Sequence, residues 1–216
     1  MADAGGESDA CREVLEFWFP EPLPSTPDTF RDQVMWWMRG GATDAICSRF
    51  AAHVERAVSG EFDDWAATPL GRLALILLLD QFTRSVYRGT LAAYAQDPKA
   101  CALALEALEN GHFERLPSVC HKMFVVIAIG HNEGPDVVQR MQRSIQLSDA
   151  LVREAPEALR PMFQFSAQQP REHLKVLERF GRYPHRNAIL GRKSTAEELD
   201  YLGDGRFPHE RELPEG

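Results

Sequence analysis

The chain has 216 residues, of which 44% are hydrophobic and 26% charged, so it can bury one sizeable core as an ordinary soluble globular domain. Its formal net charge of −8 at pH 7 argues against general binding to nucleic acid or to an anionic membrane surface. No apolar run approaches the ~20 residues of a membrane-spanning helix. We expect one domain over residues 11–203, a disordered lead-in over residues 1–10, and a loosely ordered tail over residues 204–216.

The four cysteines, Cys11, Cys47, Cys101 and Cys120, show neither a CxxC pair nor metal-ligand spacing. The lead-in also lacks the apolar segment of a secretory signal peptide. Scattered thiols without such a leader are typical of reduced cytoplasmic proteins. We therefore predict a cytoplasmic protein, and we separately predict no cofactor.

The first part of the chain predicts helices separated by proline and glycine. Residues 11–19 (CREVLEFWF) favour a first helix, which the prolines of residues 20–27 end. A second helix is expected over residues 30–38. A third should begin at Thr43 and end at Gly60, where glycine permits a left-handed exit.

The central helix should begin at Thr68, a capping residue that is followed by proline. Its residues 73–79 (LALILLL) are apolar on every side, so the helix belongs inside the domain. The same pattern at Asp97 and Pro98 predicts that Asp97 caps the next helix. Residues 118–129 contain MFVVIAI and are interpreted as a buried helix, because helices flank them on both sides.

The C-terminal part continues this pattern. A helix is expected over residues 136–154, followed by two helical pieces broken near Pro161 and Pro170, and a short last helix begins with a capping box at Thr195. Strand alternation and hairpin turns are not evident. The sequence thus predicts an all-α fold of about eight or nine helices packed around the leucine-rich central helix.

Polar residues follow the leucine run without a break in helical spacing. Asp80, Arg84 and Arg88 lie four residues apart and share one face, with Gln81 beside them. A charge at the end of a buried helix needs a partner, because stranding one costs about 3–5 kcal/mol. We predict a catalytic role for Asp80 and ligand-binding roles for Gln81, Arg84 and Arg88. An ion-pair network that only stabilises the helix end is the alternative interpretation.

A second polar cluster lies near the C-terminus, where residues 171–192 carry a surplus of arginine. A rigid turn with several arginines suits carboxylates and phosphates, because the guanidinium fork meets two oxygens at once. Gly181 and Pro184 shape this turn, while Arg171, Lys175 and Arg192 are interpreted as solvated. The residues predicted to bind ligand here are His173, Arg179, Arg182, Arg186 and Asn187, and His185 is predicted to be catalytic.

His131 ends the apolar helix and has Glu133 close by. An imidazole with a nearby carboxylate can support acid–base catalysis near neutral pH, so we predict a catalytic role for His131. A polar helix end that faces water is the alternative. No HExxH pattern occurs and the histidines do not pair at ligand spacing, so no metal site is predicted. The chain also lacks a nucleophile elbow, a phosphate-binding glycine loop and a dinucleotide fingerprint.

Four stretches carry a family resemblance: LEFWF near the start, GEFDDWAATPLGRLALILLLDQFTRSVYRGT, HNE at residues 131–133, and HLKVLERFGRYPHRNAILGR. Together they resemble the DUF924 family from about Val14 to Tyr201. The resemblance implies an all-α fold similar to tetratricopeptide-type helical arrays, and it implies no activity, because none is assigned to the family. Its motifs carry over to Trp18, Glu133 and every site residue named above. The chain departs from the family pattern at Asn132, where the family usually has serine.

Three hypotheses follow for the two polar stretches. In the first, they form a pocket for a small anionic ligand, a carboxylate or a phosphate ester, with acid–base chemistry of the hydrolase or lyase type if the protein is an enzyme. In the second, a tetratricopeptide-like helical module binds a peptide or the acidic tail of a protein partner. In the third, the arginine-rich turn is a structural clasp. The first hypothesis assigns anion binding to Arg84, Arg179 and Arg186, acid–base chemistry to His131 or His185, and orientation to Asp80 and Gln81.

Overall fold

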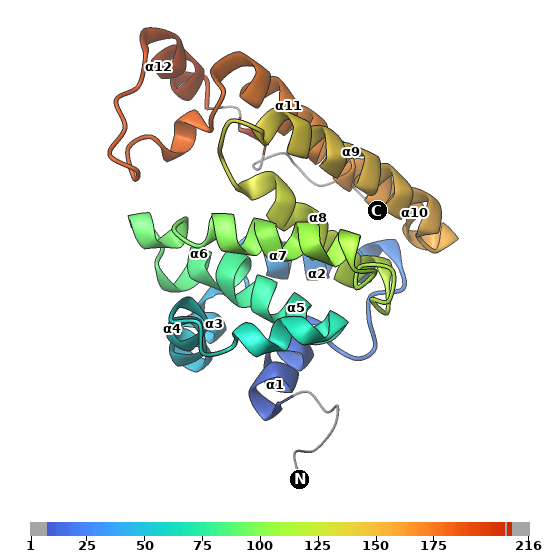
Figure 1. The fold of residues 1–216 in the computed structure, drawn as a ribbon. Coiled ribbons are helices and arrows are strands. Elements are labelled where there is room, and N and C mark those ends of the chain that lie inside the picture. Colours follow the sequence, from blue (N-terminus) through green and yellow to red (C-terminus); the bar gives the residue numbers. More distant parts are fainter. Residues whose placement is uncertain (1–7, 206, 209–216) are drawn as a thin grey trace.

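The computed structural model describes residues 8–205, 207 and 208 (Figure 1). Helices and their connections make up this described part, which contains no β-strand, so the predicted all-α class is confirmed. Most of the expected lead-in over residues 1–10 and most of the expected tail over residues 204–216 lie outside the described residues.

Four helices form the N-terminal part of the molecule: α1 (Asp9–Trp18), α2 (Pro27–Met38), α3 (Thr43–Arg49) and α4 (Ala51–Val58). The single helix expected from Thr43 to Gly60 is divided at Phe50, whose φ of −116° leaves the helical range. Gly60 ends α4 with a φ of +88°, as its position predicted. Divisions of this kind give more helical segments than the eight or nine expected.

The leucine-rich helix runs from α5 (Pro69–Ile76) through a π-helical segment (Leu77–Phe82) into α6 (Thr83–Val86). The Thr68 hydroxyl caps it by accepting the Gly71 N–H at 3.0 Å, as predicted. Residues 73–79 are each at most 1% exposed, so this helix is buried all round. It packs against α1, α7 and α8.

The remaining helices stack on one side of this centre. They are α7 (Asp97–Glu109), α8 (Val119–His131), α9 (Val137–Glu154), α10 (Arg160–Ser166), α11 (Gln169–Phe180) and α12 (Ala196–Gly203). Figure 1 shows α9 and α11 side by side, with α12 beyond the end of α11. The MFVVIAI run lies within α8, so its interpretation as a buried helix is confirmed. The tetratricopeptide-like arrangement of the helices stays a prediction.

Two clusters of buried apolar residues hold these helices together. The larger one contains residues from α1 through α8, includes Leu151 of α9 and extends into α10. The smaller one joins α9, α11 and the turn that follows α11, and consists of Val137, Met141, Val176, Leu177 and Tyr183. The arginine-rich turn therefore belongs to the smaller cluster. No helix in the described part of the chain is long and apolar enough to cross a membrane.

Candidate functional site

The central helix changes its hydrogen-bond pattern where its polar residues begin. The π-helical segment contains both Asp80 and Gln81, and such segments are frequent at functional sites. The Thr83 hydroxyl donates to the carbonyl oxygen of Leu79 at 2.9 Å. Within the segment, the Gln81 amide donates from Nε2 to Asp80 Oδ2 at 2.5 Å. The two side chains therefore form one unit at the end of the leucine run.

Asp80 holds the imidazole of His131. The Oδ1 of Asp80 lies 2.7 Å from Nδ1 of His131, and the carboxylate is completely buried while the imidazole is 31% exposed. Burial alone would raise the pKa of Asp80. The nearby His131 and Arg84 have the larger opposite effect, and together they lower this pKa to about 2. The carboxylate is thus ionised at neutral pH and fixes the orientation of the ring. Nε2 of His131 makes no hydrogen bond within the described residues.

Asp97 links the central helix to the C-terminal turn. Its Oδ1 lies 2.8 Å from Nη2 of Arg84, and its Oδ2 accepts from Nη1 of Arg186 at 3.0 Å. The same Arg186 nitrogen donates to the carbonyl oxygen of His131 at 2.8 Å. Burial and the nearby Asp80 raise the pKa of Asp97, although the two guanidiniums oppose this. These bonds connect three segments that are far apart in the sequence.

The expectation that Asp97 caps α7 is wrong. The cap position belongs to Gln96, and the side chain of Asp97, the first helical residue, makes no capping hydrogen bond. The physical reason is that Asp97 is 3% exposed and faces the buried Arg186 and the half-buried Arg84, which bind its carboxylate more strongly than a backbone N–H would.

Two tyrosine rings complete this network. The Arg84 guanidinium lies 4.7 Å from the ring centre of Tyr94. The Arg186 guanidinium lies 4.7 Å from the same ring and 4.6 Å from that of Tyr183, so it sits against both rings. Burial removes water from a guanidinium, and ion pairs alone do not fully offset this desolvation cost. Cation–π contacts of this kind offset a further part of it. The Tyr183 hydroxyl donates to the carbonyl oxygen of Gly130 at 2.7 Å.

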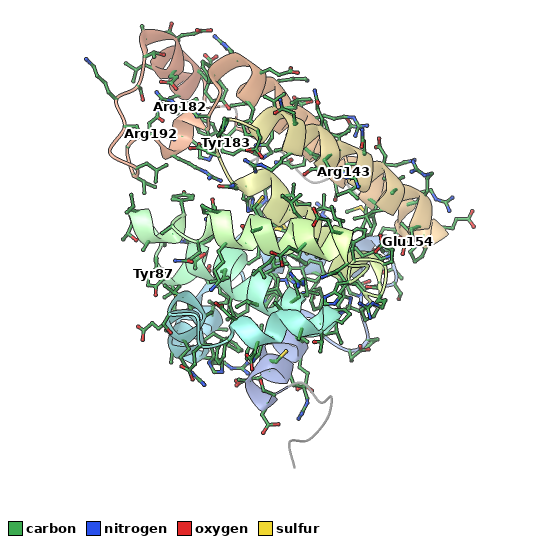
Figure 2. All side chains as sticks on the ribbon, viewed as in Figure 1. Tyr87, Arg143, Glu154, Arg182, Tyr183 and Arg192 are labelled. Atoms are coloured by element: carbon green, nitrogen blue, oxygen red, sulfur yellow. The ribbon has the colours of Figure 1, made fainter. Side chains whose placement is uncertain are left out.

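Glu133 fixes the start of the C-terminal turn. Its Oε1 accepts the backbone N–H of Tyr183 at 2.7 Å, and its carboxylate also binds the guanidinium of Arg192. Arg192 further donates from Nε to Asn187 Oδ1 at 3.0 Å. The expectation that Arg192 is merely solvated is therefore wrong, because its charge is needed to neutralise Glu133. Figure 2 shows Arg182, Tyr183 and Arg192 close together around this turn.

The meeting of the two polar stretches, on which all three hypotheses depended, is confirmed. A continuous chain of contacts runs from Arg186 through Asp97 and Arg84 to Asp80 and His131. The arginine-rich turn does fold back toward the polar end of the leucine helix. Of the predicted site residues, this network contains Asp80, Gln81, Arg84, His131 and Arg186.

The other predicted site residues lie outside this network. Arg88 donates to the Thr43 hydroxyl at 3.2 Å on an exposed face. Arg179 pairs with Glu197 and Arg182 with Glu198, both on α12. His173 and His185 pack against the ring of Tyr183, and Asn187 donates to the Ser194 hydroxyl.

The sequence reasoning missed Asp97 and Tyr94 as members of the network. The sequence did contain one signal for a second acid, which is the number of arginines compared with the number of carboxylates in the two polar stretches. One buried carboxylate, Asp80, cannot balance both Arg84 and Arg186, so a second acid had to lie nearby. In the described part of the chain, no group of three or more potential ligands is arranged to hold a metal ion.

Fold and site together define an all-α protein in which a buried aspartate holds a partly exposed histidine inside an arginine–carboxylate network. Residues 14–206 match the model of the family described as bacterial protein of unknown function (DUF924), and the chain belongs to this family. The chain is also similar to a solved structure, the protein of unknown function ATU0120 from Agrobacterium tumefaciens. The two share 31% sequence identity with a TM-score of 0.65, over 90% of this chain and 97% of the other. Comparison with functionally curated proteins gave no match.

Proposed function

We propose that the protein binds a small anionic ligand beside His131, and that His131 serves as the acid–base group of a non-redox reaction of the hydrolase or lyase type. The observation that carries this proposal is the buried Asp80 carboxylate, which holds Nδ1 of an imidazole that is still 31% exposed. An imidazole oriented in this way exchanges protons through Nε2 with a group bound next to it.

Arg84 offers an anion a partly exposed planar guanidinium beside His131, and Asp80 and Asp97 neutralise its charge. The Arg84 side chain is 23% exposed and contacts Asp80, so its charge lies next to His131. The two carboxylates of the network, Asp80 and Asp97, formally balance the two guanidiniums, Arg84 and Arg186. Protonation of His131 therefore adds one uncompensated positive charge, which favours a ligand with one negative charge, such as a carboxylate.

The roles proposed for the other predicted residues differ from this. Arg186 is 6% exposed and committed to Asp97 and to the His131 backbone, so it positions the site and does not bind the anion itself. Arg179 and Arg182 are neutralised by α12 and have no part in the proposal. A purely structural clasp would explain the ion pairs, but it gives no reason for a partly exposed imidazole fixed by a buried carboxylate.

A thermal-shift screen of small carboxylates and phosphate monoesters tests the proposal. We expect compounds that raise the melting temperature of the wild-type protein to lose this effect in His131→Gln and Arg84→Lys. Lysine keeps the charge of Arg84 but not its planar fork. His53→Gln is the matched control, because this histidine lies near Glu13 and Phe62 and contacts no member of the network.

Histidine ring signals in NMR spectra provide a second measurement. A bound anion should displace the Nε2 resonance of His131 and leave that of His53 unchanged, because His53 lies near α1 and Phe62. The proposal fails if ligand-induced shifts in melting temperature persist in both His131→Gln and Arg84→Lys. It also fails if no carboxylate or phosphate monoester perturbs His131.

A further inference from the structure

A cleft of about 560 Å³ lies at the C-terminal turn, and neither His131 nor Asp80 lines it. Its apolar lining comes from Pro184 and Ala188 in the turn and from Leu199 and Leu202 on α12. Leu199 is 58% exposed, so most of its apolar surface is in contact with water. The cleft is open to solvent over much of its extent, and its volume lies within the range of sites for small molecules.

The charge around the cleft is unbalanced. Among the described residues that line it none is acidic, whereas Lys193, Arg192 and His185 all contribute to the wall. Arg192 is neutralised by Glu133. Lys193, in contrast, forms no ion pair with any residue that the structure describes. The cleft thus combines an apolar floor with one uncompensated ammonium group.

We propose that this cleft binds a small carboxylate with an apolar body, separately from the site at His131. The carboxylate would contact the ammonium group of Lys193, and the apolar body would cover Leu199 and Leu202. An apolar ligand without charge would leave the ammonium unpaired, and an inorganic anion would leave the leucines exposed to water. Only a ligand with both parts satisfies both kinds of surface.

Hexanoate is the probe for this proposal, with hexanol and inorganic phosphate as comparison probes. Titration of the full chain by amide NMR should show shifts at residues 184–202 with hexanoate, whether or not His131 also shifts, and much weaker shifts at residues 184–202 with either comparison probe. Lys193→Gln should reduce the affinity for hexanoate about tenfold, as expected for the loss of one charge-assisted contact. Leu199→Ser should weaken binding as well, and both side chains are exposed enough for the fold to survive the change.

Lys175→Gln is the matched control, because Lys175 is an exposed lysine of α11 that is paired with Glu172 and does not line the cleft. The proposal is overturned if Lys193→Gln binds hexanoate within twofold of the wild-type affinity, or if hexanoate does not bind. Shifts centred on His131 and not on residues 184–202 would also overturn it, while supporting the function proposed for His131. Shifts at residues 184–202 would support the cleft whatever the outcome at His131.

Discussion

Asp97→Asn is the sharpest test of the network, because this side chain joins the central helix to the C-terminal turn. Asparagine has nearly the same shape as aspartate but no charge. The Asp97 side chain is 4% exposed and contacts Arg186, which is 6% exposed, and Arg84. The substitution therefore leaves a buried guanidinium without its carboxylate. We expect it to lower the free energy of unfolding by about 3–5 kcal/mol, the usual cost of breaking a buried ion pair.

Glu197→Gln is the matched control. Glu197 lies 2.7 Å from Arg179, closer than Asp97 lies to Arg186, but these side chains are 59% and 50% exposed. Water screens this pair, so the substitution should cost only about 0–1 kcal/mol. The charge change is the same in both variants, and burial is what distinguishes them.

Urea unfolding at pH 7, followed by far-ultraviolet circular dichroism, measures both costs. The double variant Asp97→Asn with Arg186→Met should be less destabilised than the sum of the two single variants, because it contains no stranded buried charge at Arg186. The reasoning is refuted if Asp97→Asn and Glu197→Gln cost the same to within about 1 kcal/mol, or if the two network substitutions are simply additive.

Two further predictions concern the core. Gly71→Ala should destabilise the protein by about 1–3 kcal/mol, because the new Cβ would lie 2.4 Å from the carbonyl oxygen of Trp65. Gly203→Ala, which meets nothing within 4 Å, is the control, and equal melting temperatures would contradict the prediction. Burial lowers the pKa of His121 to about 4 from 6.5, so the unfolded chain gains a proton at a higher pH than the folded protein. The stability this histidine contributes, about 3 kcal/mol, is therefore present above pH 6.5 and lost as the pH falls toward 4. His121→Phe should flatten the pH dependence of urea midpoints between pH 7 and pH 5, and an unchanged slope would contradict this.

The helical architecture was predictable because its signals are local. Thr68 and Pro69 mark the start of the central helix, and the Thr68 hydroxyl caps it through a hydrogen bond only three residues away. The apolar run over residues 73–79 requires burial on every face of the helix. Gly181 ends α11 with a φ of +68°, and Thr195 forms the capping box of α12 with Glu198. Each of these features depends on residues only a few positions apart, which is why a single sequence contains enough information to predict them.

The site was predictable only in part, because the choice of ionic partner is a property of the folded chain. The i, i+4 spacing correctly placed Asp80 next to Arg84, but nothing local indicates that Arg84 also reaches Asp97. An aspartate before a proline is equally compatible with a cap and with a buried counter-ion, and only the packing of α7 against the central helix decides between them. The π-helical segment was not predicted for a similar reason, since a shift of hydrogen-bond register has no counterpart in helix propensity.

The clasp and the candidate site are two consequences of one arrangement. The imidazole of His131 is held by Asp80 from the larger apolar cluster, while its backbone carbonyl is held by Arg186 from a turn that packs in the smaller cluster. The position of His131 therefore depends on how the two clusters pack against each other. Because charge-assisted hydrogen bonds are directional, the ion pairs between the clusters restrict their relative position more than apolar contacts would. A clasp built this way keeps the orientation of a proton-exchanging group constant, which is what acid–base chemistry at His131 requires.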